Sequence, residues 1–208
     1  KPESSKRPLT EDEALRLVDG CTMPHVRLFV ILALTTAART AAILELTWDR
    51  VHFDTGIINL KAPRVVDWLQ KKSQKRRAVV VMNSWARGEL LQAKAGALTA
   101  HVIEWNGEPV KCIRKGFVAA CGRGGLGADV TPHTLRHTAA TWMEEAGIPM
   151  SQISRFVGHK DEATTRTIYS HPRPAHLTAA AEVVNLERVR ERRSQVHQTK
   201  APFVGRSS

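Results

Sequence analysis

Five side chains of this chain are of the types that phosphodiester chemistry requires: Arg39, His133, Arg136, His159 and Tyr169. An arginine fork binds two phosphate oxygens at once, and a histidine transfers protons near neutral pH. A tyrosine can act as a covalent nucleophile, and Tyr169 is the only tyrosine in the 208 residues. Together these side chains predict a site that handles a phosphodiester without a metal ion.

His133 and Arg136 stand three residues apart at the start of a predicted helix, so they should share a helix face. The first turn of a helix attracts anions through its free N–H groups and its dipole. The dipole also favours the neutral form of His133, which can accept a proton. A basic turn that faces solvent is the plain alternative. His133 and His137 have the spacing of a zinc-binding helix, but Thr134 stands where that motif has glutamate, so zinc is disfavoured.

The other candidates also have structural alternatives. Arg39 lies between alanine-rich stretches and needs an anionic partner, which a salt bridge to Glu45 or Asp49 would also provide. His159 follows a glycine that typically ends a helix. Tyr169 on an amphipathic helix is, by base rate, a core aromatic. The combination of these residues, and no single one, favours a phosphodiester site.

Composition indicates a globular protein with a polyanionic partner. Hydrophobic residues make up 42% and charged residues 25% of the chain, which is typical of a packed domain. The net charge is +11 and the pI about 10.1, which favours nucleic acid as the partner over a merely basic surface. The length suits one domain with at most a short appendage.

A run of cations divides two predicted strands. It is interpreted as a basic hairpin tip that contacts phosphates or solvent. A lysine within it could also protonate a leaving oxygen at a broken phosphodiester. The cations of the run are Lys71, Lys72, Lys75, Arg76 and Arg77.

Cysteine usage and the chain start suggest an intracellular fragment. The three cysteines form no CxxC motif, so we expect reduced thiols, with Cys112 and Cys121 as a buried pair. The longest apolar run, residues 28–34, is too short to cross a bilayer, and no signal peptide opens the chain. The polar lead from Lys1 resembles a linker from a longer protein.

Periodicity and capping signals predict a mainly helical chain. Thr10 and Glu13 form a capping box, and Pro132 at a first helical position follows a Thr131 cap. The predicted helices are 11–19, 24–36, 41–46, 84–95, 113–121, 132 to about 146, 151–157, 162–170 and a long amphipathic one at 175–193. The predicted strands are 57–60, 65–69, 78–82 and a hairpin of 101–105 with 108–110.

The order of these motifs resembles the tyrosine recombinase (phage integrase) family. The run Pro-His-Thr-Leu-Arg-His-Thr-Ala-Ala-Thr from Pro132 is specific to it, and Arg39 with the apolar residues after it resembles the family's first arginine box. The match covers about residues 8–185. Two departures lie beside Arg39. Ala37 replaces a usual glycine, and Ala42 replaces a frequent acidic residue.

The resemblance implies a mainly α fold with a small antiparallel β-sheet. It also implies a site-specific DNA recombinase that forms a 3′-phosphotyrosyl intermediate and needs no cofactor. Tyr169 would attack the phosphorus, and Arg39 and Arg136 would hold the non-bridging oxygens. His133 would act as general base and His159 would hydrogen-bond the phosphate. The leaving 5′-oxygen would be protonated by Lys72, with Lys75 as the alternative.

The resemblance further implies a layout and partners. Residues 1–9 would be a linker, 10–185 the catalytic domain, and 186–208 a helix end and tail exchanged between protomers. Double-stranded DNA, other protomers in a tetramer and an accessory DNA-bending protein would be the partners, at the nucleoid in the cytoplasm. Two alternatives stay open: a type IB topoisomerase, and a DNA-binding protein whose catalytic site has decayed.

Overall fold

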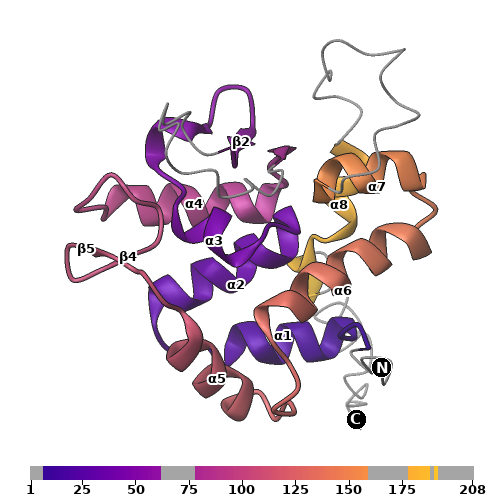
Figure 1. The fold of residues 1–208 in the computed structure, drawn as a ribbon, viewed down its shortest axis with the longest axis horizontal. Coiled ribbons are helices and arrows are strands. Elements are labelled where there is room, and N and C mark those ends of the chain that lie inside the picture. Colours follow the sequence, from indigo (N-terminus) through magenta and orange to yellow (C-terminus); the bar gives the residue numbers. More distant parts are fainter. Residues whose placement is uncertain (1–6, 62–77, 159–177, 188–189, 192–208) are drawn as a thin grey trace, which may run out of the picture.

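The computed structural model describes residues 7–61, 78–158, 178–187 and 190–191 (Figure 1). Several predictions therefore lie outside the described residues. These are the strand at 65–69, the helix at 162–170, and the side chains of Lys71, Lys72, Lys75, Arg76, Arg77, His159 and Tyr169.

Helices dominate the described residues, as the sequence predicts. They are α1 (Glu11–Asp19), α2 (Pro24–Thr36), α3 (Thr40–Leu44), α4 (Ser84–Ala95), α5 (Arg114–Arg123), α6 (Pro132–Glu145), α7 (Met150–Val157) and α8 (Thr178–Val183). A short 3-10 helix spans Trp48–Arg50. These bounds confirm the predicted helices in this part of the chain to within about two residues, except the last one.

Two small antiparallel sheets complete the fold. The first has the strand order β1 (Val51–His52), β2 (Ile57–Asn59) and β3 (Val79–Val81), and Ile58 pairs with Val80. The second is a hairpin of β4 (Glu104–Trp105) and β5 (Glu108–Pro109). Its turn uses Asn106 and Gly107, both with positive φ, which confirms the Asn-Gly hairpin signal. The mainly α fold with small antiparallel sheets is therefore confirmed.

Helix α2 forms the centre of the core (Figure 1). Its residues from Leu28 to Thr36 are all buried, and it contacts α1, α3, α4, α5 and α6. A helix that is apolar on every side is stable only when other elements surround it. The fold therefore fixes the C-terminal end of α2, where the chain turns toward Arg39.

Capping chemistry sets where α1 and α6 begin. Thr10 Oγ1 accepts the backbone N–H of Glu13 at 3.2 Å, and the Glu13 carboxylate accepts the N–H of Thr10 at 2.9 Å. Thr131 and Thr134 form the equivalent box at α6, with Pro132 at its first position. Gly147, with φ +77°, follows the end of α6. Both predicted starts are confirmed.

The long helix predicted at 175–193 is wrong. Helix α8 ends at Val183, and the Asn185 side chain accepts the N–H of Glu187 at 3.2 Å to begin a new turn. Asparagine competes with the helix in this way because its side chain bonds nearby backbone groups. The break lets Val184 and Leu186 both reach the core, where they are 0% and 1% exposed. Their apolar side chains are therefore buried within this chain.

The expected buried pair of thiols is also wrong. Cys121 is buried on α5, but Cys112 is exposed because it precedes the helix, and Ile113 takes the core position instead. Burial raises the pKa of Cys121, and that of Cys21, to about 11, so both stay as thiols. Throughout the described residues, every helix is too short or too polar to cross a lipid bilayer.

Candidate active site

Arg39 lies where the chain passes from α2 to α3. Helix α2 ends at Ala37, whose φ of 49° is left-handed, and Arg39 in extended conformation forms the N-cap of α3. Glycine adopts a left-handed backbone freely, whereas alanine does so at some cost. This geometry gives the physical reason why a glycine suits position 37. Thr36 Oγ1 accepts the N–H of Ala38 at 3.2 Å and closes the turn.

Arg136, in the second helical turn of α6, reaches the Ala37 segment that follows α2. Its Nη1 donates to the carbonyl oxygen of Ala37 at 2.6 Å, across 99 residues of sequence. The side chain is only 5% exposed, and its Nη2 is buried without a hydrogen-bond partner among the described residues. Burial, with a smaller contribution from the nearby charge of Arg39, lowers the pKa of Arg136 to about 10. An anion would satisfy the open donor and relieve the charge repulsion.

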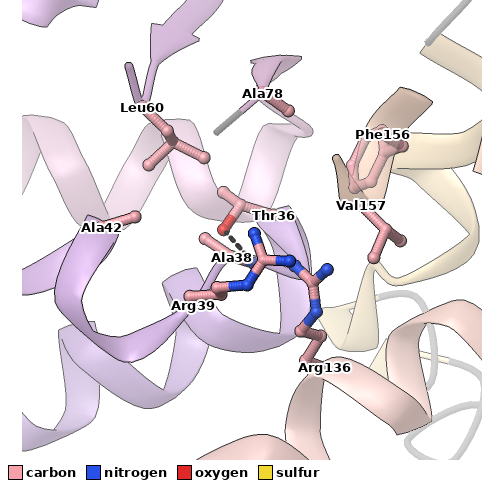
Figure 2. Close-up of a pocket in the computed structure, with 9 residues that line it drawn as sticks. All are labelled: Thr36, Ala38, Arg39, Ala42, Leu60, Ala78, Arg136, Phe156 and Val157. Atoms are coloured by element: carbon pink, nitrogen blue, oxygen red, sulfur yellow. Dashed lines mark hydrogen bonds between the residues drawn. The ribbon is translucent and has the colours of Figure 1, made fainter. Parts of the chain in front are cut away.

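The two arginines face one small pocket. Figure 2 shows their guanidinium groups beside each other, with Leu60 and Ala78 on one side and Phe156 and Val157 on the other. The remaining lining residues are Thr36, Ala38 and Ala42. The pocket thus combines two forked cations with apolar walls, which strengthens electrostatic interactions inside it.

His133 lies three residues before Arg136 in the first turn of α6. It is exposed, whereas Arg136 is buried, so the two side chains differ in environment although they share the start of one helix. His137, one turn further on, is also exposed. In the described part of the chain, no group of three His, Cys, Asp or Glu residues is placed to hold a metal ion.

Two of the remaining candidate residues directly adjoin, in the sequence, described residues at or beside this pocket. His159 directly follows Gly158, which ends α7 in a left-handed conformation (φ 72°) beside the pocket residues Phe156 and Val157. Arg77 directly precedes Ala78, which also lines the pocket. The positions of His159 and of the predicted lysines and Tyr169 stay predictions, because these residues lie outside the described residues.

Sequence reasoning missed two contributors. The first is the carbonyl of Ala37, which holds Arg136; only the family's usual glycine at this position hints at the special turn. The second is Arg50, a buried arginine that bonds the carbonyl of Glu45 at the end of α3 and that no motif marks. A buried arginine surrounded by backbone acceptors leaves no periodic signal in a sequence.

Comparison with known proteins identifies the family of the chain. Residues 7–176 match the model of the family described as "Phage integrase family", which is most of the chain and includes the pocket. The chain belongs to the phage integrase family.

Named relatives support the assignment. The chain is 28% identical over 184 residues to the tyrosine recombinase XerD of Lacticaseibacillus casei, covering 82% of this chain and 59% of the relative. It is 28% identical over 192 residues to the integrase of Salmonella phage P22, covering 85% of this chain and 46% of the relative. The chain thus spans about half to three fifths of the length of these two relatives.

Solved structures share the fold. A crystal structure of XerA recombinase superposes with a TM-score of 0.64 at 21% identity, covering 95% of this chain and 66% of that one. A lambda integrase dimer bound to a COC′ core site gives a TM-score of 0.60 at 18% identity, covering 80% of this chain and 61% of that one. This member of the phage integrase family therefore shares its fold with these solved structures.

Proposed function

We propose that this chain carries the catalytic activity of a site-specific DNA recombinase that breaks and rejoins DNA through a 3′-phosphotyrosyl bond. The observation that carries the proposal is the arginine pair. Arg136 Nη2 is buried without a hydrogen-bond partner among the described residues, and burial, then Arg39, lowers the pKa of Arg136 to about 10 at a pocket that both arginines line. A phosphodiester supplies the missing acceptor and negative charge.

The proposed reaction exchanges one phosphodiester for another. The phenol oxygen of Tyr169 bonds to phosphorus as the bond from phosphorus to the 5′-oxygen breaks. His133 takes the phenol proton, and Lys72 or Lys75 gives a proton to the 5′-oxygen. His159 donates to the phosphate. Arg39 and Arg136 stabilise the charge that builds on the non-bridging oxygens. Rejoining reverses each transfer, so the diester energy is kept and no nucleotide is consumed.

The proposal extends to partners and place of action. The net charge of +11 suits double-stranded DNA. Integrases of similar fold have been solved bound to DNA, one of them as a dimer. We propose further protomers in a tetramer on DNA and an accessory DNA-bending protein as partners. The nucleoid would be the place of action.

Covalent capture tests the proposal without a known target sequence. The purified protein is incubated with a library of nicked duplexes that carry a randomised stretch, and DNA bound after denaturation is sequenced. We expect adducts that share a common sequence, joined to the protein at a 3′-phosphate. Absence of adduct would contradict the proposal, and adducts without a shared sequence together with plasmid relaxation would indicate a topoisomerase.

A further inference from the structure

Arg50 is a buried cation next to the active site that the proposed reaction does not use. It ends the 3-10 helix after α3 and is 7% exposed. Each of its three side-chain nitrogens donates to a neighbour. Nε bonds Thr47 Oγ1 at 3.0 Å, Nη1 bonds the carbonyl of Lys61 at 2.8 Å, and Nη2 bonds the carbonyl of Glu45. One guanidinium thus joins two backbone carbonyls and one side-chain hydroxyl.

Two of these acceptors lie next in the chain to elements that line the arginine pocket. Glu45 is the C-cap of α3, the helix that Arg39 begins. Lys61 follows Leu60, which lines the pocket, and Leu60 N–H bonds the carbonyl of Ala78 at 3.1 Å. Arg50 therefore links the helix that presents Arg39 to the strand end on the other side of the pocket.

Helix α3 depends on such support. It spans only five residues, Thr40–Leu44, and its N-cap Arg39 makes no side-chain capping bond. A helix this short is not stable by itself. The backbone N–H of its C-cap Glu45 bonds the carbonyls of Ala41 and Ile43. Arg50, which bonds the Glu45 carbonyl, adds a positive charge at this end that complements the helix dipole. The place of Arg39 therefore rests on what holds the two ends of α3.

We infer that Arg50 is a positioning residue that sets the distance between Arg39 and the β2 end of the pocket. The inference rests on the proposed function. Arg50 touches no substrate; it acts through α3 and β2. Lysine cannot replace it, because an ammonium is a single point of charge, whereas the planar fork reaches separate acceptors.

The test compares Arg50→Lys with a matched control, Arg123→Lys. Arg123 also ties two elements through a carbonyl, donating from Nε to Gly20 O at 2.6 Å, but it joins α5 to the end of α1. Cleavage rates are measured at saturating DNA on nicked duplexes of the captured sequence. One duplex has a normal scissile phosphate, and the other has a neutral methylphosphonate that lacks one charged oxygen.

Arg50→Lys should slow cleavage of the normal phosphate about tenfold or more, because even ~1 Å of misplacement costs about a hundredfold. The same substitution should slow cleavage of the methylphosphonate duplex by less than about threefold, because less charge is left for the arginines to stabilise. Arg123→Lys should match the unchanged protein on both substrates. Equal slowing on both substrates would show a general structural loss and overturn the inference, as would no slowing on either.

Amide hydrogen exchange without DNA tests the positioning role of Arg50 independently of cleavage. In Arg50→Lys the amides of Ala42, Ile43, Glu45 and Leu60 should exchange faster, because their bonds to Arg39 O, Ala41 O and Ala78 O lose their support. Unchanged exchange at these amides would overturn the inference. If the unchanged protein forms no adduct with DNA, the proposed function fails, and this exchange measurement still decides on Arg50.

Discussion

At the scale of residues, the candidate active site holds two like charges, Arg39 and Arg136, beside each other at a cost. Arg136 donates one hydrogen bond to the Ala37 carbonyl, and its second terminal nitrogen is buried with no partner in the described part of the chain. Repulsion from Arg39 adds to the burial that lowers the pKa of Arg136. A site preorganised in this way gains most when negative charge increases, as it does in a phosphoryl-transfer transition state.

Inorganic phosphate should stabilise the protein through this pair. A ligand that binds only the folded state raises the free energy of unfolding by RT ln(1 + [L]/Kd), about 2.7 kcal/mol at a hundred times Kd. We expect phosphate to raise Tm relative to chloride at equal ionic strength, and Arg136→Met to lose most of this rise. Arg123→Met, which removes an arginine away from the pocket, should keep it. An equal rise in Arg136→Met would show that phosphate binds elsewhere.

At the scale of elements, capping and periodicity predicted most of the fold. The starts of α1 and α2 follow from Thr10 and Pro24 as the sequence predicts, and α4 begins at the predicted residue, Ser84, after an Asn83 cap that was not predicted. The break after α8 was missed because it depends on tertiary contacts: Asn185 donates to Ser84 Oγ at 2.9 Å, over 101 residues. The site was predictable in residue type, but the bond from Arg136 to Ala37 arises only from packing.

The capping box of α1 should make stability depend on pH in the acid range. Hydrogen bonds from Arg7, then from the Thr10 backbone, lower the pKa of Glu13 to about 2 from the ordinary 4.5. A carboxyl whose folded pKa is lowered stabilises the fold above its unfolded pKa, and this is lost as pH falls through the folded pKa. Glu13→Gln should therefore lower the free energy of unfolding by about 1 kcal/mol above pH ~5. This difference between the variant and the unchanged protein should shrink as pH falls toward 2.

Urea unfolding at a series of pH values measures this difference. Glu11→Gln serves as the control, because it removes a carboxylate from the same helical turn outside the capping box. A Glu13→Gln difference that stays constant between pH ~5 and ~2 would show that the capping carboxylate does not titrate as expected.

Helix α8 should depend on one buried asparagine of a distant element. Asn83, 2% exposed, caps α4 through Oδ1 and donates from Nδ2 to the carbonyl of Ala181 at 2.9 Å. Asn83→Ser keeps a capping residue but removes the long reach to α8. We expect it to lower the free energy of unfolding by about 1–3 kcal/mol, because a buried carbonyl loses its donor. In the same urea titration, Asn59→Ser on strand β2 should change the free energy of unfolding by under ~0.5 kcal/mol. Equal effects of the two substitutions would contradict a stabilising role of the bond from Asn83 to Ala181.

At the scale of the whole molecule, charge should govern encounter with DNA. The net charge of +11 supplies phosphate contacts, and each contact contributes about −0.9 to the slope of log K against log salt. Changing Arg76 and Arg77 together to Gln should make the slope shallower by about 1.8. A matched pair, Arg16 and Arg123, lies on α1 and α5, on the other side of α2 from the β2–β3 sheet (Figure 1). Changing Arg16 and Arg123 to Gln should leave the slope nearly unchanged. If both double variants change the slope equally, Arg76 and Arg77 do not contact DNA phosphates in the way proposed.

The central claim is that Tyr169 becomes covalently joined to DNA in a pocket organised by Arg39 and Arg136. Its most direct measurement is mass spectrometry of the protein–DNA adduct trapped on a nicked duplex, after nuclease and protease digestion. The account predicts a nucleotide 3′-phosphate on the peptide that contains Tyr169, and no adduct from Tyr169→Phe, which binds DNA as well as the unchanged protein. A modified serine, cysteine or other residue, or an adduct that persists in Tyr169→Phe, would contradict it.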